Sequence, residues 1–346
     1  GDQGHANGQS LQRLIKEVRD GNLSMVFHVG DFAYNFESGD GANGDAYMRD
    51  IEPIAATVPY MVVPGNHESS VRFNAYTHRF ANQPSNSGTV TMPEFGPMPN
   101  NWWFSWNAGL VHFVSISTEV YMDQYYIDLG LVARQWEWLR QDLMRANANR
   151  SEAPWIVVGG HRPLYCSCDG DCDGASETLR DGVWDGQGRQ VNGLERLFYA
   201  YGVDVYVAGH EHNYERMYDV APARNATVPW LSGATTQSTV NPPATVHVVT
   251  GSAGNIERHE AFKRAAPPRT AFRSNTYGYS RMRVYNRTHV RWEQVMTDNG
   301  QPPEEDGRVI DSVWWVQEHH GPFEGRRPGP RPSPPKRATT VDVVRD

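Results

Sequence analysis

Residues 25–34 read Met-Val-Phe-His-Val-Gly-Asp-Phe-Ala-Tyr, a short apolar run that ends abruptly at Gly30 and Asp31. A run of about 4–8 apolar residues that stops at a glycine is typical of a buried β-strand followed by a turn. The chain repeats this pattern downstream, with apolar runs that lead into polar residues at 58–67, 155–161 and 203–212. The repetition predicts a sheet of buried strands with a polar loop after each strand.

The polar residues at these strand ends are of types that bind metals. They are Asp31 and Tyr34, Asn66 and His67, His161, and His210 with His212, and Asp2 adds a carboxylate near the start of the sequence. Ligands of open α/β sheets bind at the carboxyl ends of the strands, and carboxylate, phenolate, amide and imidazole groups suit hard or borderline metal ions. Side chains two residues apart on an extended segment point the same way, as two ligands to adjacent metals do. We therefore predict a metal site at this edge of the sheet.

The remaining pattern predicts the other layers of the fold. Apolar residues recur at helical spacing in residues 9–19, with Ser10 as the expected N-cap, and again in 133–145 and 193–200. Residues 102–117 alternate around a turn and predict a hairpin, and further strands are expected at 246–250, 282–285 and 290–295. Strands, polar loops and helices in alternation, followed by antiparallel hairpins, favour a layered α/β domain with mixed sheets.

The composition excludes several classes of protein. The 346 residues are 39% hydrophobic and include 11 Trp, 16 Tyr and 12 Phe, enough to build a buried core. Acidic residues outnumber basic ones 40 to 32, which argues against a nucleic-acid-binding protein. No stretch approaches the roughly 18–20 apolar residues of a membrane helix. We expect a soluble globular protein that has neither nucleic acid nor a membrane as its partner.

The cysteines and glycosylation sequons bear on the compartment. Cys166, Cys168 and Cys172 are the only cysteines, and they form either one local disulfide with a remaining thiol or three reduced thiols. A zinc knuckle is disfavoured because no fourth ligand stands at a suitable spacing. Sequons that would accept glycans in a secretory compartment begin at Asn22, Asn149, Asn225 and Asn286.

Taken together, the strand-end motifs resemble those of the purple acid phosphatases, within the calcineurin-like metallophosphoesterases. The five sequence blocks of that family stand here as Gly1-Asp2-Gln3-Gly4, Gly30-Asp31-Phe32-Ala33-Tyr34, Gly65-Asn66-His67-Glu68, Val158-Gly159-Gly160-His161 and Gly209-His210-Glu211-His212. The resemblance covers roughly residues 1–316. It implies a four-layer α/β/β/α sandwich with two mixed sheets, formed by a catalytic domain over residues 1–320. Residues 321–346 are rich in Pro and Arg, and this composition predicts a disordered tail.

The resemblance also implies a dinuclear metal centre. Asp2, Tyr34 and His212 would bind one metal, Asn66, His161 and His210 the other, and Asp31 would bridge the two. A phenolate is a hard, strongly donating anion and favours Fe(III), whereas amide and imidazole donors accept Zn, Mn or Fe in the divalent state. The implied reaction is acid hydrolysis of small phosphate monoesters by a metal-bound hydroxide. His67 would not be a ligand, and as an imidazolium it could protonate the leaving group.

Two departures from the family pattern accompany the resemblance. Several relatives carry additional histidines about ten residues beyond the ligand that matches His161, but residues 162–176 contain none and hold cysteines and aspartates instead. The sequence also begins at the first block, so we expect the strand before Asp2, a signal peptide and any upstream β-sandwich domain to be missing from it. A secreted or vacuolar/lysosomal location is expected.

Three alternatives remain at this point. The same metal core would serve a phosphodiesterase or a nucleotide pyrophosphatase, and a non-catalytic secreted relative would keep the fold and one metal. Histidines outside the motifs are interpreted as core residues (His28 and His112) or as solvent-facing residues (His259, His319 and His320).

Overall fold

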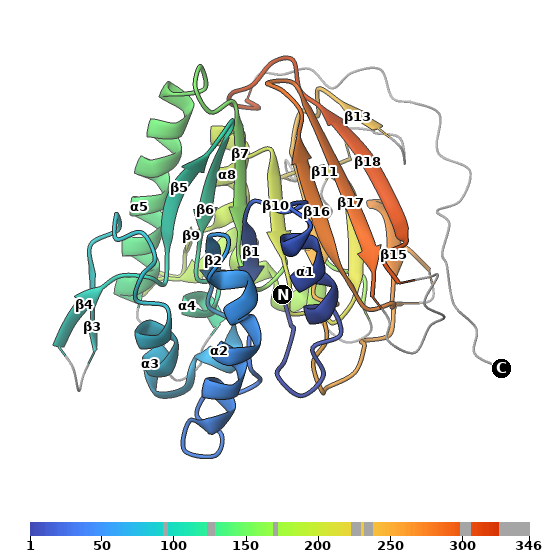
Figure 1. The fold of residues 1–346 in the computed structure, drawn as a ribbon. Coiled ribbons are helices and arrows are strands. Elements are labelled where there is room, and N and C mark those ends of the chain that lie inside the picture. Colours follow the sequence, from blue (N-terminus) through green and yellow to red (C-terminus); the bar gives the residue numbers. More distant parts are fainter. Residues whose placement is uncertain are drawn as a thin grey trace.

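The computed structural model (Figure 1) describes residues 1–92, 96–122, 129–168, 172–222, 230–231, 238–263, 265–297 and 306–324. Its largest element is an eight-stranded mixed sheet. The path through this sheet runs β12 (Trp230–Leu231), β11 (Tyr214–Ala221), β14 (Thr245–Thr250), β10 (Val205–Ala208), β7 (Trp155–Gly159), β6 (Val111–Ser115) and β5 (Phe104–Ala108), and β15 (Thr270–Ser274) also pairs with β11. Strands β14, β10, β7 and β6 are parallel. Because parallel strands end at one edge, the loops after β7 and β10 lie beside each other.

A second layer of strands packs on this sheet in two pieces. One is the parallel pair β1 (Val26–Val29) and β2 (Tyr60–Val63). The other is a four-stranded mixed sheet in the order β13 (Ser238–Val240), β18 (Val309–Val316), β17 (His289–Met296) and β16 (Gly278–Val284). Val29 and Val63 of the pair, Val157 and Val207 of the large sheet and Trp292 of β17 share one buried cluster between the layers. The loops after β1 and β2 are thereby brought to the edge where β7 and β10 end.

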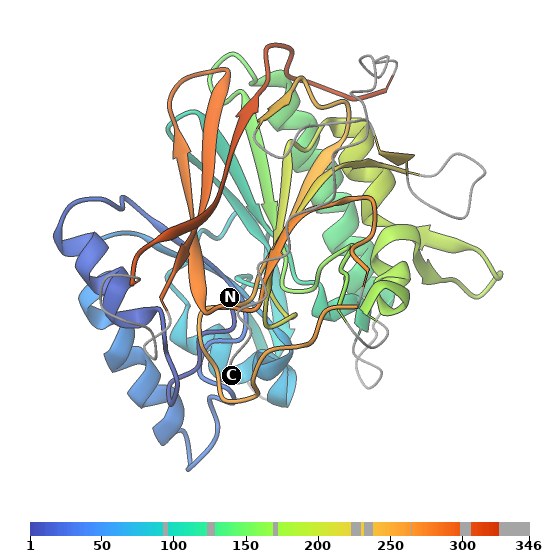
Figure 2. The ribbon, with the colours of Figure 1, turned by 90° about the vertical axis from the view of Figure 1, so that its right-hand side faces the viewer.

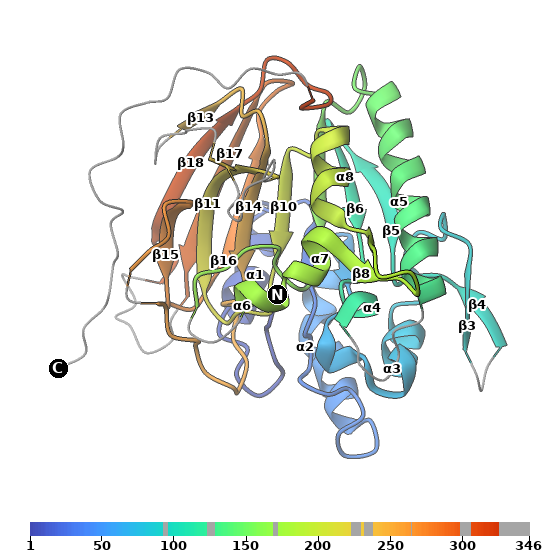
Figure 3. The same cartoon turned by 180° about the vertical axis from the view of Figure 1, so that it is seen from behind.

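Helices cover the two strand layers on their outer sides. Figure 2 shows α5 (Leu129–Ala148) and α8 (Leu194–Tyr201) against one side, and α1 (Leu11–Arg19) and α2 (Ala42–Ala55) on the opposite side. The shorter elements are η1 (Asn66–Glu68), α3 (Ser70–Arg79), β3 (Thr89–Met92), β4 (Gly96–Pro99), α4 (Glu119–Met122), α6 (Cys172–Ala175), α7 (Glu177–Asp181), β8 (Gly182–Trp184) and β9 (Gln190–Asn192). Figure 3 shows α3, α4, α6, α7 and β8 from behind. The arrangement confirms the predicted layered α/β fold with mixed sheets. No helix in the described ranges has the length and apolar character to cross a membrane.

The structure contains the predicted helices and the predicted hairpin, and it also contains strands that the sequence analysis did not predict. The helices predicted at 9–19, 133–145 and 193–200 correspond to α1, α5 and α8, and the hairpin at 102–117 is β5–β6. Ser10 occupies the N-cap position of α1 as predicted, but its hydroxyl makes no capping hydrogen bond and bonds to the hydroxyl of Thr297 instead. Strands β11 and β18 were not predicted, because polar and charged residues such as Arg216 and Asp311 interrupt them. Those two side chains form a buried ion pair, with Nε and Oδ2 2.7 Å apart.

The predicted boundary at residue 320 remains a prediction. The described part of the chain ends at residue 324, so the tail predicted at 321–346 lies almost entirely outside the described residues.

Candidate metal centre

All eight predicted site residues meet at the edge where the central strands end. Asp31 follows β1, Asn66 and His67 follow β2, His161 follows β7, and His210 and His212 follow β10. Asp2 lies beside them because its backbone N–H donates to the carbonyl of Gly30, with N and O 3.0 Å apart. The side chains of Asp2, Asp31 and His161 have at most 1% exposure. Buried carboxylates and imidazoles are shielded from solvent, so their charges must be balanced by one another or by a cation.

The first group, here called the asparagine cluster, consists of Asn66, His161 and His210. Nε2 of His161 lies 3.0 Å from Oδ1 of Asn66 and 3.2 Å from Oδ2 of Asp31. Asp31, His161 and His210 offer ligand atoms that all lie within 4.8 Å of one another. Nδ1 of His161 faces the carbonyl of Val29 at 3.0 Å. A carbonyl only accepts, so Nδ1 donates to it and Nε2 is left facing the centre of the site.

The second group, the tyrosine cluster, consists of Asp2, Tyr34 and His212. Nε2 of His212 lies 2.8 Å from the Tyr34 hydroxyl and 3.6 Å from Oδ1 of Asp2. Nδ1 of His212 faces the Arg258 carbonyl at 2.9 Å and Oε1 of Glu260 at 3.2 Å. The same rule applies as for His161: acceptors outside the site hold Nδ1–H, and Nε2 points inward.

Backbone strain is concentrated at these residues. Asp2, Asp31, Tyr34 and His210 have φ angles of 62°, 53°, 58° and 70°. The left-handed region costs a non-glycine residue about 1–2 kcal/mol, and strain of this kind gathers at functional sites. Two neighbouring glycines leave room for the carboxylates. A Cβ on Gly65 would lie 2.2 Å from Oδ1 of Asp31, and one on Gly209 would lie 2.3 Å from Oδ2 of Asp2.

Glu68 holds the loops after β1 and β2 together, a role the sequence analysis missed. This fully buried carboxylate accepts hydrogen bonds from the backbone N–H groups of Asp31, Phe32 and Gly65, with N and O 2.9–3.0 Å apart. Three donors to one carboxylate fix the two loops relative to each other. The signal available in the sequence was the acidic residue directly after Asn66-His67.

Burial and mutual charge shift the pKa values of the acidic groups of the site in different directions. Burial and the neighbouring charge of Asp31 raise the pKa of Asp2 well above its ordinary value. Burial also raises the pKa of Tyr34, and the carboxylates of Asp2 and Asp31 raise it further. Burial alone would raise the pKa of Asp31, but His161 outweighs it, and the pKa of Asp31 is lowered.

The histidines respond to the same charges in different ways. Burial disfavours the charged form of His161, but Asp31 more than offsets this and raises the pKa of His161 to about 10. Burial lowers the pKa of His210 and of His212, so both imidazoles are neutral near pH 7. A neutral imidazole offers the lone pair that a metal requires. Buried carboxylates, a phenol and inward-facing Nε2 atoms thus form a donor set that fits two metal cations.

His67 lies over the centre without belonging to either cluster. Its Nδ1 is 3.0 Å from Oδ1 of Asn35, and its ring centroid is 4.4 Å from that of Tyr34. Its Nε2 is 3.9 Å from Oδ2 of Asp31 and 3.5 Å from Oε1 of Glu257. The imidazole is 17% exposed, so it borders both the buried carboxylates and the solvent.

Other residues support the site from behind. His259 was predicted to face solvent, but it is half-buried, and its Nδ1 lies 2.6 Å from the carbonyl of His212. The prediction was wrong because the loop around residues 255–260 folds back on the site, which no local pattern indicates. His28 lies in the core as predicted, with Nδ1 2.8 Å from the Tyr60 hydroxyl.

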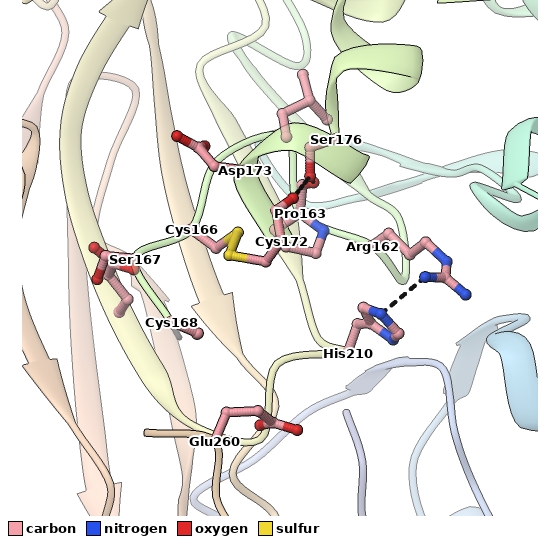
Figure 4. Close-up of a disulfide and its surroundings, with 12 residues drawn as sticks. Arg162, Pro163, Cys166, Ser167, Cys168, Cys172, Asp173, Ser176, His210 and Glu260 are labelled. Carbon is pink, nitrogen blue, oxygen red and sulfur yellow. Dashed lines mark hydrogen bonds between the residues drawn. A yellow bond between two sulfur atoms is a disulfide. The ribbon is translucent and has the colours of Figure 1, made fainter. Parts of the chain in front are cut away.

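The cysteine loop borders the asparagine cluster (Figure 4). Cys166 and Cys172 form a disulfide, and Cys168 is a buried free thiol. Of the two pairing options left open by the sequence, the structure therefore has one local bridge with a remaining thiol. In the described part of this loop, Asp173 is paired with Arg269, with Nη2 and Oδ2 2.9 Å apart.

Comparison with known proteins connects this geometry to a family. Residues 4–214 match the calcineurin-like phosphoesterases, and residues 244–312 match the family described as iron/zinc purple acid phosphatase-like protein C. Acid phosphatase type 7 from Danio rerio is 43% identical over 328 residues, which cover 93% of this chain and 68% of that protein. The protein of the same name from Homo sapiens is 41% identical over 329 residues, covering 94% and 68%.

A solved structure shares the fold. Purple acid phosphatase PPD1 from yellow lupin (Lupinus luteus) seeds superimposes with a TM-score of 0.64 at 23% identity, over 92% of this chain and 50% of that chain. The chain thus spans about two thirds of the length of the two curated relatives and half the length of the lupin protein.

Proposed function

The chain belongs to the calcineurin-like phosphoesterases of the purple acid phosphatase type, a family of phosphate monoester hydrolases, and from this membership we propose that it is an acid phosphatase with a dinuclear Fe(III)–M(II) centre. One observation carries the proposal. Two groups of metal-binding side chains converge on the same strand edge, with Nε2 of both His161 and His212 aimed inward by acceptors bonded to Nδ1.

The donor types suit two different ions. Asp2, Tyr34 and His212 would hold Fe(III), Asn66, His161 and His210 would hold Zn, Mn or Fe in the divalent state, and Asp31 would contact both. When bound, the metal pair supplies Lewis-acid activation of water and neutralises charge on the phosphoryl oxygens. The hydrogen bonds of Glu68 hold the loops in this arrangement and offset part of the cost of the strained backbone.

His67 is proposed as the catalytic acid. Its Nδ1 is held by Asn35, which leaves Nε2 facing the centre and the open side. From that position Nε2–H donates a proton to the oxygen of the departing alcohol, which otherwise leaves as a costly alkoxide. Oε1 of Glu257 lies 3.5 Å from this Nε2, on the more exposed side of the imidazole.

We also place the protein in the secretory pathway. The Cys166–Cys172 disulfide is of the kind that persists in oxidising compartments. The sequon residues Asn22, Asn149 and Asn286 are exposed, as glycosylation requires, and Asn225 lies outside the described residues.

The test combines metal analysis with substrate profiling. Protein expressed in a eukaryotic secretory host should contain two metals per chain, one of them iron, and should show a visible tyrosinate-to-iron band. It should hydrolyse 4-nitrophenyl phosphate at acidic pH faster than bis(4-nitrophenyl) phosphate. A metal-loaded protein that prefers the diester would replace the proposal with a phosphodiesterase, and a metal-loaded protein inert on both would indicate a non-catalytic relative.

A further inference from the structure

A single guanidinium group lies against the asparagine cluster. Nη1 of Arg162 is 2.8 Å from Nε2 of His210, as the dashed line in Figure 4 shows. The Arg162 side chain is 22% exposed, whereas of its two neighbours in this contact network Glu119 is buried and His210 is half-buried. A cation at this depth, next to a proposed metal ligand and still open to solvent, is placed to meet an incoming anion.

The backbone of Arg162 is fixed from two sides. Its N–H donates to the hydroxyl of Thr118 at 2.9 Å, and its carbonyl accepts from the hydroxyl of Tyr206 at 2.7 Å. The residue before His161 must be small for this arrangement, because a Cβ on Gly160 would lie 2.3 Å from the Tyr206 oxygen and 2.8 Å from Cγ2 of Thr118. The position of the Arg162 backbone after β7 is therefore fixed, and so is the direction in which its side chain begins.

Glu119 fixes the guanidinium itself. Nε of Arg162 lies 2.9 Å and 3.0 Å from the two oxygens of Glu119, whose side chain is only 3% exposed. The hydroxyl of Thr118 in turn lies 3.2 Å from Oε1 of Glu119. A charged hydrogen bond to a buried carboxylate removes most of the rotational freedom of an arginine side chain. The Nη atoms are left at the end facing the centre, and Nη2 has no partner within the described part of the chain.

The contact between Arg162 and His210 uses a lone pair of the imidazole that would not survive metal binding by His210. An imidazole nitrogen has one lone pair, and it cannot serve both an N–H donor and a metal ion. If Nε2 of His210 bound the metal, its lone pair would be taken, and if Nδ1 bound the metal, Nε2 would carry the ring proton. In either case Nη1 of Arg162 would lose its acceptor while Glu119 would still hold the rest of the side chain. The nearest new acceptor of matching charge is an oxygen of the phosphate that the metal pair binds.

The surrounding loop offers no competing cation among its described residues. Apart from Arg162 itself, residues 162–168 and 172–176 contain no histidine, lysine or arginine. The loop's one acidic residue in these ranges, Asp173, is paired with Arg269 rather than aimed at the site. Among the described residues of this loop, Arg162 is thus the cationic side chain available to a substrate.

From these contacts we infer that Arg162 is a substrate-binding residue that donates hydrogen bonds from its guanidinium to a phosphoryl oxygen, and that Glu119 is its positioning residue. The inference rests on the proposed function and specifies its substrate. A monoester presents three non-bridging oxygens and up to two negative charges, whereas a diester presents two oxygens and one charge. An additional guanidinium beside the metals favours the dianion, so Arg162 selects monoesters over diesters.

The experiment uses the metal-loaded wild-type protein and the variant Arg162→Gln. Metal content is measured first, then the dissociation constant for inorganic phosphate by calorimetry, then kcat/KM on 4-nitrophenyl phosphate and on bis(4-nitrophenyl) phosphate. Arg189→Gln is the matched control, because Arg189 is 65% exposed and pairs only locally with Asp185. We expect Arg162→Gln to keep both metals and to weaken phosphate binding by about 10–100-fold, the range for loss of a charge-assisted hydrogen bond. The loss of kcat/KM should be at least about tenfold larger for the monoester than for the diester.

Three results would overturn the inference. The first is an unchanged phosphate affinity of Arg162→Gln, and the second is an equal loss of kcat/KM on both substrates. The third is loss of a metal from Arg162→Gln, because Arg162 would then support His210 rather than bind the substrate. A wild-type protein with two metals that neither binds phosphate nor cleaves the monoester would instead reject the proposed function. If Arg162→Gln does not fold, Arg162→Lys replaces it, and a phosphate affinity equal to wild type would contradict the requirement for a guanidinium.

Glu119 is tested through its coupling to Arg162. Glu119→Gln should weaken phosphate binding by a few fold, and the double variant with Arg162→Gln should bind phosphate no more weakly than Arg162→Gln alone. Such non-additivity is expected when one residue acts only through the other. Fully additive losses would mean that Glu119 acts independently of Arg162.

Discussion

The tyrosine and asparagine clusters lie at the same sheet edge but differ in charge. The tyrosine cluster combines a carboxylate and a phenol with one imidazole, and the carboxylate of Glu260 stands behind His212. The asparagine cluster combines a neutral amide with two imidazoles, and the cation Arg162 stands beside it. Anionic donors stabilise an ion of higher charge, whereas neutral donors and a nearby cation do not. The difference favours a trivalent ion at one cluster and a divalent ion at the other.

In the proposed centre Asp31 serves both clusters, so its substitution should remove the difference between them. Asp31→Asn deletes a negative charge that shifts the pKa values of His161 and of Tyr34. We expect loss of both metals and a fall in monoester hydrolysis of at least about 10³-fold, equivalent to several kcal/mol of charge stabilisation. Metal analysis and a phosphatase assay check this. Asp50→Asn, which alters a carboxylate paired with His5 instead, is the control, and near-normal activity of Asp31→Asn would contradict the proposed site.

Tyr34→Phe should affect one cluster and spare the other. The substitution removes the hydroxyl that lies 2.8 Å from His212 and leaves the asparagine cluster unchanged. We expect the visible band to vanish and iron affinity to fall by about 10–100-fold or more, with the divalent metal retained. Metal content and visible absorption are measured against Tyr285→Phe, a change at an exposed tyrosine. Retention of the visible band would show that Tyr34 is not an iron ligand.

His67→Gln should leave both clusters filled and slow only the departure of the alcohol. We expect a loss of about 10²–10³-fold in kcat, within the range for general acid catalysis. The loss should be larger for phenyl phosphate than for 4-nitrophenyl phosphate, because the better leaving group needs less protonation. His319→Gln, at an exposed histidine, is the control. Equal losses for the two substrates would reduce His67 to an orienting role.

Asp219 lies in β11, outside both clusters. Its substitution by Asn should change the free energy of unfolding and leave both clusters intact. Burial raises the pKa of Asp219 to about 7 from an ordinary value of 3.8. The folded protein therefore holds this proton more tightly than the unfolded chain does. The contribution of the proton to stability is complete below about pH 4 and is lost as the pH rises to about 7.

Asparagine does not ionise, so Asp219→Asn should not lose stability in this way as the pH rises. The free energy of unfolding of the variant minus that of wild type should therefore increase between pH 4 and pH 8 by on the order of 3–4 kcal/mol. Denaturant unfolding at several pH values checks the slope. A pH-independent difference between the two proteins would mean that Asp219 is ionised in the folded protein.

Much of this site could be predicted from the sequence, because its residues follow apolar strands. The runs that end at Asp31, Asn66, His161 and His210 indicate both the layer and the edge on which these residues meet. Glu68 and Arg162 were missed as supporting and binding residues, because their roles depend on contacts between loops far apart in the chain. Glu119, for example, meets Arg162 across 43 residues of sequence. Local patterns carry no information about such pairs.

The most direct test of the difference between the clusters is anomalous X-ray scattering from crystals of the metal-loaded protein, recorded on both sides of the iron absorption edge. We predict an iron peak beside the hydroxyl of Tyr34 and a second ion beside Asn66 and His161. If the second ion is zinc or manganese, it should give no iron-edge signal. Iron located only beside Asn66, or a single ion shared by all seven ligands, would contradict the assignment of a trivalent ion to the tyrosine cluster.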